Sequence, residues 1–398
     1  MTFGNLGGKK MSYFQAAVVS IIAFAFACSN AAPTGVSEDQ VFTATDGQAK
    51  FKVETVAGGL EVPWGFAWLP NGDLLFTERP GRVRTIEGGK LRAEAVYVVP
   101  DVEPSSESGL MDISLHPGFA ENGFVYLAYA YRGDGKQVKV VRYKYSSGKF
   151  TEPKIIVESI PAAPNHAGTR ARFGPDGMLY VTTGDSTDWK LAQKTDSLAG
   201  KTLRLNGDGS IPKDNPFAGK QGYRPEIWTI GNRNAQGLAW QPGTGLMFQT
   251  EHGPSFFEGR GGGGDEVNIV EAGRNYGWPE ISHKETRAGM ESPLLEYSPA
   301  CAPASAMFYT GDKFPEFKGN FFFGCLRGAR IIRVVLNGRS VVGQENLLEG
   351  NLGRIREMSE GPDGFIYFST SNRDGRGRPA ADDDRIMRLV PVSEAPTK

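Results

Sequence analysis

A strand–turn–strand unit recurs six times along the 398-residue chain, and this repeat constrains the fold more than any other feature. In each unit an apolar strand leads into a turn rich in Pro, Gly, Asp or Asn, and a second apolar strand follows. The Gly-Pro-Asp-Gly turns at 174–177 and 361–364 are the clearest cases. Pro presets φ at about −65° there, and Gly accepts a positive φ. The six units span 63–84, 109–129, 169–185, 234–251, 305–334 and 354–371.

Strand-rich units that repeat with a mean period of roughly 58 residues predict an all-β fold, a six-bladed β-propeller with four-stranded antiparallel blades. The strand at 51–57 (FKVETVA) is expected to close the ring by pairing with the last blade, around 385–390. An array of β-sandwiches and a solenoid are the alternatives. The period is long for a solenoid, and the units are too similar for unrelated sandwiches.

The N-terminus has the pattern of an export signal, in which Lys9 and Lys10 precede a short apolar stretch at 15–27. Two interpretations stay open, an ordinary secretory signal or a bacterial lipoprotein signal that leaves a lipid on Cys28. Either one predicts an exported protein, periplasmic or lipid-anchored to the outer membrane. The predicted organisation is a signal peptide at 1–28, a flexible tether at 29–48, the propeller at 49–393 and a tail at 394–398.

The formal net charge is −1 and no basic stripe is present, which argues against nucleic acid as a partner. Beyond the export signal only Cys301 and Cys325 remain. In an oxidising compartment two remaining cysteines usually pair, so we expect a Cys301–Cys325 disulfide between neighbouring strands. Two buried free thiols are the alternative. The protein is expected to be a monomer or a homodimer.

His166 stands just before the third unit, and the other units have no histidine at this place. The hairpin is therefore a structural feature of the repeat, whereas the histidine occurs in one copy only and can act as a base near neutral pH. In a propeller the inner strands begin at one mouth of the central channel. Arg233, Arg354 and Arg356, at matching places in other units, would converge on His166 there. A hydrogen-bonded structural histidine is the alternative.

Seven motifs occur together and in one order over residues 60–389, and this set resembles the soluble quinoprotein sugar dehydrogenases (the glucose/sorbosone dehydrogenase family, which includes aldose sugar dehydrogenases). They are HAGTR at 166–170, GNRNAQGL at 231–238, EHGP at 251–254, DEVN at 265–268, NYGWP at 275–279, LRG at 326–328 and GRIR at 353–356. The resemblance implies a six-bladed propeller that binds pyrroloquinoline quinone (PQQ) and Ca²⁺ and oxidises aldose sugars to lactones.

The resemblance also implies roles for individual residues. His166 resembles the general base that takes the proton of the sugar's C1 hydroxyl while hydride passes to the quinone, and Arg233 resembles the residue between substrate and quinone. The cofactor contacts implied are Glu107, Asn234, Arg327, Arg354 and Arg356. The backbone carbonyls of Gly253 and Pro254 would bind the Ca²⁺. Tyr276 belongs to a structural corner or, as the alternative, offers its carbonyl to a second Ca²⁺.

Elementary chemistry agrees with these roles. Arginines pair with the carboxylates of an anionic cofactor, and Ca²⁺ takes oxygen ligands that include backbone carbonyls. A metal on the quinone oxygen acts as a Lewis acid, and the cofactor performs the redox chemistry.

Three departures from the family pattern stand near the site. Asn165 replaces an acid, so His166 is expected to lack a carboxylate, and Thr169 replaces a glycine, which predicts a tighter pocket floor. The segment at 255–264 (SFFEGRGGGG) is longer than in aldose enzymes, and Phe256 and Phe257 are expected either to cover the site or to move with the glycines.

Two other functions remain as alternatives. One is a non-catalytic propeller that binds a carbohydrate or a protein. The other is a Ca²⁺-dependent propeller lactonase, against which the arginine-rich rim argues because arginines repel a metal ion.

Overall fold

The computed structural model describes residue 1, residues 33–45, residue 47 and residues 49–392. The chain divides into two units, 1–31 and 32–398, and the features below belong to the second. The predicted export signal with Cys28 and the predicted tail at 394–398 lie outside the described residues. In the described part of the chain, no helix has the length and apolar character needed to cross a membrane.

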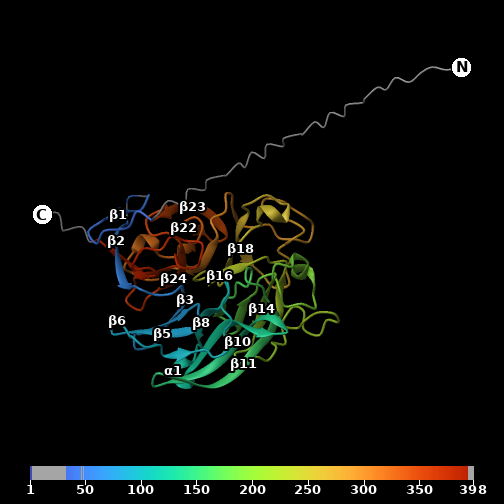
Figure 1. The fold of residues 1–398 in the computed structure, drawn as a ribbon, viewed down its shortest axis with the longest axis horizontal. Helices are drawn as coiled ribbons and strands as arrows, with labels where there is room; N and C mark the ends of the chain where they lie inside the picture. The colour runs from blue at the N-terminus through green and yellow to red at the C-terminus, as the bar shows by residue number, and fades with distance from the viewer. Residues whose placement is uncertain (2–32, 46, 48, 393–398) are drawn as a thin grey trace. The chain divides into compact units, whose positions relative to one another are not determined.

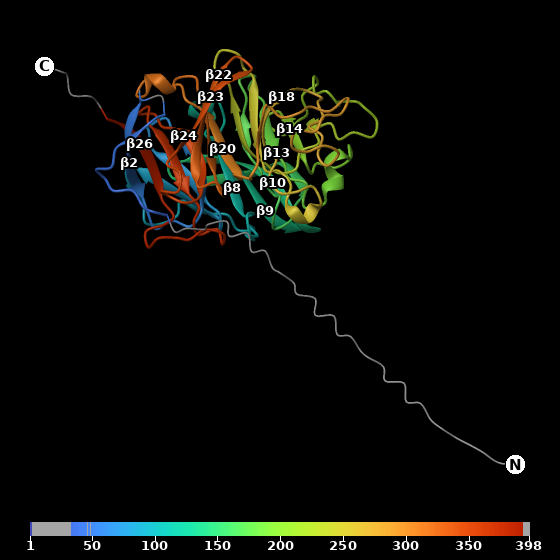
Figure 2. The ribbon, with the colours of Figure 1, turned by 90° about the horizontal axis from the view of Figure 1, so that it is seen from above.

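Six antiparallel sheets form the blades of a β-propeller, so the predicted fold is confirmed (Figures 1 and 2). The first blade contains β3 (Pro63–Trp68), β4 (Leu74–Glu78), β5 (Arg82–Glu87), β6 (Lys90–Leu91) and β7 (Tyr97–Val98). The second contains β8 (Leu110–Leu115), α1 (Phe119–Asn122), β9 (Phe124–Gly133), β10 (Gly135–Ser146) and β11 (Lys149–Pro161). The third contains β12 (Ala171–Phe173), β13 (Leu179–Thr182), η1 (Trp189–Gln193), β14 (Lys201–Leu205) and β15 (Ile227–Ile230).

The other three blades continue the pattern. The fourth contains β16 (Ala235–Trp240), β17 (Met247–Glu251), η2 (Phe256–Glu258), β18 (Asp265–Val270) and β19 (Leu295–Tyr297). The fifth contains β20 (Pro303–Phe308), η3 (Pro315–Phe317), β21 (Phe321–Cys325), β22 (Arg330–Asn337) and β23 (Ser340–Leu347). The sixth contains β24 (Ile355–Glu360), β25 (Ile366–Thr370) and β26 (Ile386–Pro391), with β2 (Lys50–Ala57) and β1 (Phe42–Thr43) added at its outer edge.

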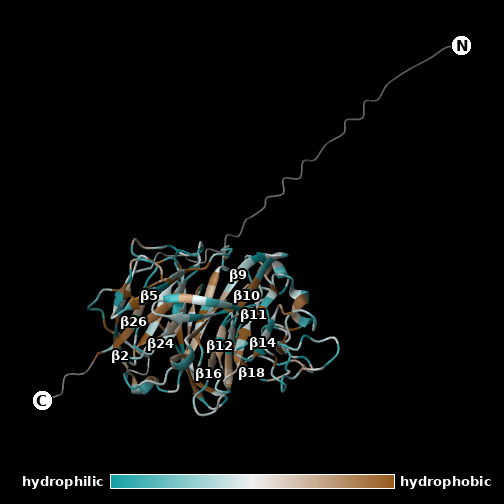
Figure 3. Cartoon of the chain, turned by 90° about the horizontal axis from the view of Figure 1, so that it is seen from below, coloured by the Kyte–Doolittle hydropathy of each residue, from teal (hydrophilic) through white to brown (hydrophobic). Residues whose placement is uncertain are grey.

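Each of the six sequence units corresponds to the first strands of one blade. These first strands contact one another around the channel, since β24 touches β3, β3 touches β8, β8 touches β12 and β16 touches β20. Figure 1 shows β3, β8, β16 and β24 towards the middle and β6 and β11 towards the periphery. In Figure 3 the hydrophobic colour is concentrated on the strands, and the connecting loops are more hydrophilic. The turn-punctuated repeat therefore marks the inner half of every blade.

The predicted closing strand is confirmed, because β2 pairs antiparallel with β26, from Phe51 opposite Pro391 to Ala57 opposite Ile386. Part of the segment expected as a tether is also bonded to the propeller. The Thr34 amide donates to the Gly350 carbonyl oxygen at 3.3 Å, and β1 pairs with β2. The first and last parts of the described propeller are thus joined in one blade.

A cluster of four charges, three of them buried, joins strands around the central channel. The Arg170 Nη1 lies 2.9 Å from Asp112 Oδ1 and 2.7 Å from Glu357 Oε2. Arg172 contacts the same two carboxylates at 2.8 and 3.2 Å. The Arg170 guanidinium also lies 4.4 Å from the centroid of the Trp64 ring. Burial opposes the charge of Arg170, but the two carboxylates raise its pKa above the ordinary value. This arginine is therefore held charged inside the ring.

The expected disulfide is not formed in the structure, which holds Cys301 and Cys325 as two buried free thiols. The spacing argument placed the pair correctly, since Cys301 precedes β20, Cys325 ends β21, and the two thiols share a hydrogen bond. This hydrogen bond and burial raise the pKa of Cys301 well above its usual range. Spacing predicts that two cysteines meet, but it does not dictate whether they are oxidised.

Removing Arg170 is expected to destabilise the propeller strongly. Arg170→Met leaves Asp112 and Glu357 with less compensation in a buried site, and we expect a loss of about 3–5 kcal/mol in the free energy of unfolding. Urea unfolding measures this loss. Glu54→Gln, which breaks an exposed pair with Arg388 at 2.8 Å, is the control and should cost less than about 1 kcal/mol. Equal effects of the two substitutions would contradict a structural role for the channel cluster.

Candidate active site

His166 lies between β11 and β12 in a strained backbone position, with a φ of 54°. Only a glycine fits behind it, because a Cβ at Gly184 would collide with the His166 carbonyl oxygen. The left-handed conformation costs energy for a non-glycine residue and persists only when the surroundings fix it. The residue is 8% exposed, so the loop holds a nearly buried histidine at the start of an inner hairpin.

A carboxylate supports this histidine. The His166 Nδ1 lies 2.8 Å from Oδ1 of Asp185, a residue with no exposed surface. Asp185 is itself oriented, because the indole Nε1–H of Trp278 donates to its Oδ2 at 2.8 Å and the Thr187 amide donates to its Oδ1 at 2.8 Å. The carboxylate accepts the Nδ1 proton, which leaves Nε2 as the basic nitrogen. The arrangement has the geometry of a general base with its orienting acid.

The expectation that His166 lacks a carboxylate is therefore wrong. It considered only the neighbouring Asn165, whose Oδ1 instead accepts hydrogen bonds from Ser106 Oγ and Arg376 Nη2 at 2.7 and 2.6 Å. Asp185 was hidden by its distance of 19 residues in sequence. The sequence did contain a signal for this pairing. Asp185 ends the third repeat unit, and a hairpin brings its last residue back to the end of the blade where its first residue lies, next to His166.

Two predicted cofactor residues lie beneath the His166 loop. One oxygen of Glu107 accepts hydrogen bonds from the Ala167 amide and from Asn234 Nδ2, both at 3.1 Å. Asn234 Oδ1 in turn accepts the Gly168 amide at 3.0 Å. Both side chains are buried. The structure thus brings Glu107 and Asn234 together with His166 and uses them to brace its backbone.

Arg233 is buried beside the dyad, because its carbonyl oxygen accepts the Asp185 amide at 2.7 Å. Its guanidinium forms a two-pronged pair with Glu258, at 3.2 Å from Nε and 2.8 Å from Nη2. Nη1 donates to the His252 carbonyl oxygen at 3.1 Å. Arg233, the arginine predicted to lie between substrate and quinone, is therefore adjacent to the predicted base. Its guanidinium forms an ion pair with a carboxylate of the 255–264 segment.

The long 255–264 segment meets the site through Glu258 rather than through an aromatic lid. Phe256 is 77% exposed, and the side chain of Phe257 lies outside the description. The turn η2 has a capping box, in which Glu258 also accepts the Ser255 amide. Of the two alternatives, covering of the site by Phe256 finds no support, because its ring is largely exposed and lies next to Gly262.

Arg354 and Arg356 share one carboxylate. Asp374 Oδ2 lies 2.7 Å from Arg354 Nη2 and 3.5 Å from Arg356 Nη2. Arg356 is 2% exposed, and its other hydrogen-bond partners are neutral, Ser371 Oγ at 3.0 Å and Gln236 Oε1 at 3.5 Å. Burial lowers the pKa of Arg356 to about 10, although Asp374 opposes this shift. The pair is therefore short of negative charge, unlike Arg170 with its two carboxylates.

The remaining predicted residues have different settings. Arg327 is exposed in the turn between β21 and β22. The Gly253 amide donates to Asp265 Oδ1 at 2.8 Å, and a Cβ on Gly253 would collide with the carbonyl oxygens of Gly263 and Gly264. Carbonyl oxygens therefore crowd around this residue. Pro254 is buried next to it. Within the described residues no three His, Cys, Asp or Glu side chains gather as a metal site.

Tyr276 is 4% exposed. Its hydroxyl donates a hydrogen bond to the Ile269 carbonyl oxygen at 2.7 Å and accepts one from the Glu271 amide at 2.9 Å. This agrees with a structural corner. The corner has a consequence that the sequence did not reveal. It carries Trp278, whose indole orients Asp185, and Arg233 lies 5.4 Å from the centroid of that ring.

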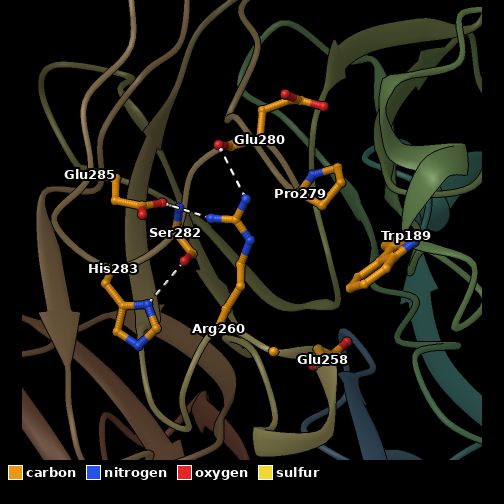
Figure 4. Close-up of a pocket in the computed structure, with 9 residues that line it drawn as sticks. Trp189, Glu258, Arg260, Pro279, Glu280, Ser282, His283 and Glu285 are labelled. Carbon is orange, nitrogen blue, oxygen red and sulfur yellow. Dashed lines mark hydrogen bonds and ion pairs between the residues drawn. The ribbon is translucent and has the colours of Figure 1, made fainter.

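A cavity of about 690 Å³ opens next to these residues (Figure 4). Trp189 on η1 forms one wall, Glu258 and Arg260 of the 255–264 segment form a second, and Pro279, Glu280 and Glu285 form a third. Glu258 belongs both to this cavity and to the Arg233 pair. Glu258 therefore lies between the cavity and Arg233 of the candidate active site.

A family model described as glucose / sorbosone dehydrogenase matches residues 60–387. An aldose sugar dehydrogenase of Escherichia coli is 35% identical over 347 residues, covering 82% of this chain and 92% of that protein. Quinoprotein glucose dehydrogenase B of Acinetobacter calcoaceticus is 30% identical over 270 residues, covering 60% and 54%. The solved structure of a PQQ-bound aldose sugar dehydrogenase from Streptomyces coelicolor has a TM-score of 0.76 at 34% identity, covering 86% and 99%. The chain belongs to the glucose/sorbosone dehydrogenase family.

The Glu258 contacts are expected to hold the 255–264 segment in place. Glu258→Ala removes the pair with Arg233 and the cap of η2, so trypsin should cleave after Arg260 several times faster, as measured by limited proteolysis and mass spectrometry. Glu271→Ala, which removes an exposed partner of Arg339 at 3.1 Å, is the control. Unchanged cleavage in the Glu258 variant would mean that the segment is held by other contacts.

Proposed function

We propose that this chain is a PQQ- and Ca²⁺-dependent oxidoreductase that oxidises aldose sugars at the C1 hydroxyl to lactones. The observation that carries the proposal is the buried His166–Asp185 dyad, with Arg233 packed beside it. Membership of the glucose/sorbosone dehydrogenase family supports it as well. We also propose export, on the basis of the N-terminal signal pattern, with a periplasmic or lipid-anchored location.

The dyad explains how the chain removes a proton. Asp185 fixes the imidazole so that Nε2 is free to accept the proton of the sugar hydroxyl, and it stabilises the imidazolium that results. Trp278 fixes Asp185 in turn, at 2.8 Å from its Oδ2. Arg233 lies on the same side with its guanidinium paired to Glu258, and it would donate hydrogen bonds to substrate and quinone oxygens that replace this carboxylate. When bound, PQQ supplies the hydride acceptor.

The residues present fit an anionic quinone. Arg354 and Arg356 are short of negative charge, and a ligand carboxylate would supply what Asp374 alone does not. Gln236 lies between the pair and the loop that holds His166, because its Oε1 is 3.5 Å from Arg356 and its side chain packs close to Gly168. Glu107, Asn234 and Arg327 are the other proposed contacts.

The surroundings of Gly253 and Pro254 fit Ca²⁺, a hard cation that takes carbonyl oxygens. The crowding of the Gly263 and Gly264 carbonyl oxygens against Gly253 places such oxygens close together. The Tyr276 carbonyl is retained as a proposed second Ca²⁺ ligand. Its corner already has a structural role, so this second site is not needed to explain the residue.

The two other candidate functions receive less support from the geometry. A binding-only propeller has no use for a strained histidine oriented by a buried carboxylate and a tryptophan. A lactonase would need carboxylate side chains around a central metal, whereas the channel carboxylates Asp112 and Glu357 are occupied by Arg170 and Arg172.

Reconstitution tests the proposal directly. PQQ and Ca²⁺ are added to the purified protein, and the quinone absorbance and the reduction of a dye are followed with a panel of aldoses. We expect stoichiometric binding and sugar-dependent reduction. His166→Ala should abolish turnover and keep cofactor binding, and Asp185→Asn should lower turnover on the order of a hundredfold. Failure of the wild-type protein to bind PQQ would overturn the proposal and favour a binding propeller.

The arginine pair gives a second test. Arg354→Ala and Arg356→Ala are each expected to weaken PQQ binding about ten- to hundredfold, because each removes a charge-assisted hydrogen bond to a carboxylate. Equilibrium titration of quinone absorbance measures the affinity. Arg339→Ala removes a surface arginine and should leave the affinity unchanged. If Arg354→Ala and Arg339→Ala behave alike, the carboxylate-clamp role is wrong.

A further inference from the structure

The 255–264 segment places one of the chain's own carboxylates on Arg233. Arg233 is 3% exposed, and among the described side chains Glu258 is the only carboxylate that contacts its guanidinium, at 3.2 Å from Nε and 2.8 Å from Nη2. A buried cation needs such a partner, because an unpaired charge inside a protein destabilises the folded state. The chain itself therefore supplies the negative charge that this arginine requires.

The hydrogen bonds of the Arg233 guanidinium leave little room for a ligand. A guanidinium has five N–H donors, and four of these are used here. Nη1 donates to the His252 carbonyl oxygen at 3.1 Å, whereas Nε and Nη2 donate to Glu258 and, at 3.3 Å, to Ser255 Oγ. A ligand that accepts more than one hydrogen bond from this guanidinium therefore has to displace an oxygen of the 255–264 segment.

The segment is built so that it can be displaced. None of the hydrophobic clusters formed by the described residues includes a residue of 255–264, and Phe256 is 77% exposed. Gly259 and Gly261 have φ values of 75° and 76°, and no atom lies within 4 Å of the place where a Cβ would stand on either. Polar contacts, not apolar packing, therefore hold the segment.

Two ion pairs provide most of these polar contacts. Arg260 lies 2.8 Å from Glu285, with side chains that are 29% and 55% exposed, and an exposed pair of this kind contributes at most about 1 kcal/mol (Figure 4). The side chains of Arg233 and Glu258 are only 4% and 10% exposed. The Glu258 pair is thus the better shielded anchor, and it is formed with a residue of the candidate active site.

We propose that Glu258 is an autoinhibitory carboxylate, which occupies Arg233 until oxygens of the incoming ligand replace it, and that this exchange releases the 255–264 segment. The identity of the ligand as PQQ rests on the proposed function. The exchange adds two properties to that function. Ligand binding is weakened by the loss of an internal ion pair, and loading of the site is coupled to opening of the segment.

Affinity tests the competition. Glu258→Gln removes the charge but keeps the side-chain length and an oxygen that can cap η2. PQQ binding in the presence of Ca²⁺, followed by quinone absorbance, should be about tenfold tighter in this variant, because no charge-assisted hydrogen bond has to be broken. Glu271→Gln, at an exposed pair with Arg339, is the control and should bind like wild type. Equal or weaker binding by Glu258→Gln would overturn the proposal.

Limited proteolysis tests the release of the segment. In wild type, PQQ with Ca²⁺ should make trypsin cleave after Arg260 several times faster than Ca²⁺ alone. In Glu258→Gln the segment has already lost its anchor, so cleavage should be fast with or without PQQ. Slower cleavage of wild type on addition of PQQ would show that the segment closes over the ligand, which contradicts the proposal.

A simple anion separates this proposal from the proposed function. If neither wild type nor Glu258→Gln binds PQQ, the proposed function fails, and sulfate then serves as the competitor because its oxygens accept hydrogen bonds from a guanidinium. Sulfate should accelerate cleavage after Arg260 in wild type, relative to chloride at the same ionic strength, and should have no such effect in Glu258→Gln. No acceleration in wild type would overturn the autoinhibitory role as well.

Discussion

The propeller depends on one buried cation, because Arg170 contacts four other blades from its place at the start of the third. Its guanidinium meets Asp112 of the second blade, Glu357 of the sixth and the ring of Trp64 in the first, and its Nε donates to the Gln236 carbonyl oxygen of the fourth at 3.1 Å. Hydrophobic packing between neighbouring blades is non-directional. A charge that must satisfy fixed partners is directional, so it sets how the inner strands stand around the channel.

The chain therefore contains two kinds of buried arginine, which differ in how many carboxylates compensate their positive charge. Arg170 has two carboxylates, and its pKa is raised above the ordinary value despite burial. Arg356 shares a single carboxylate with Arg354, and burial lowers its pKa to about 10. A buried charge that lacks a complete opposite charge nearby destabilises the folded state, and such a charge often marks a site where a ligand supplies the missing opposite charge. The same residue type at the same end of the inner strands thus serves the scaffold in one blade and, under the proposed function, would bind the ligand in another.

Much of the fold and part of the site could be predicted from the sequence, and the rest required distances. The turns at 174–177 and 361–364 fix local hairpins, so the repeat count and the closing strand followed from local chemistry. The meeting of Glu107, Asn234 and His166 followed from the resemblance. The partnership of His166 with Asp185 could not be seen in neighbouring residues, because it joins the two ends of a hairpin. The free thiols of Cys301 and Cys325 and the 77% exposure of Phe256 are also features that no local pattern encodes.

The 255–264 segment is tied to the candidate active site by one of its own charges, because Glu258 pairs with Arg233. Its glycines allow a tight path against Gly253, where a Cβ would collide with two carbonyl oxygens. Its charged residues fasten it on two sides, Glu258 to the buried Arg233 and Arg260 to the more exposed Glu285. The dyad and the arginine pair lie on the inner strands and their adjoining loops. A change in the segment would therefore reach the dyad through Arg233, whose carbonyl oxygen accepts the Asp185 amide at 2.7 Å.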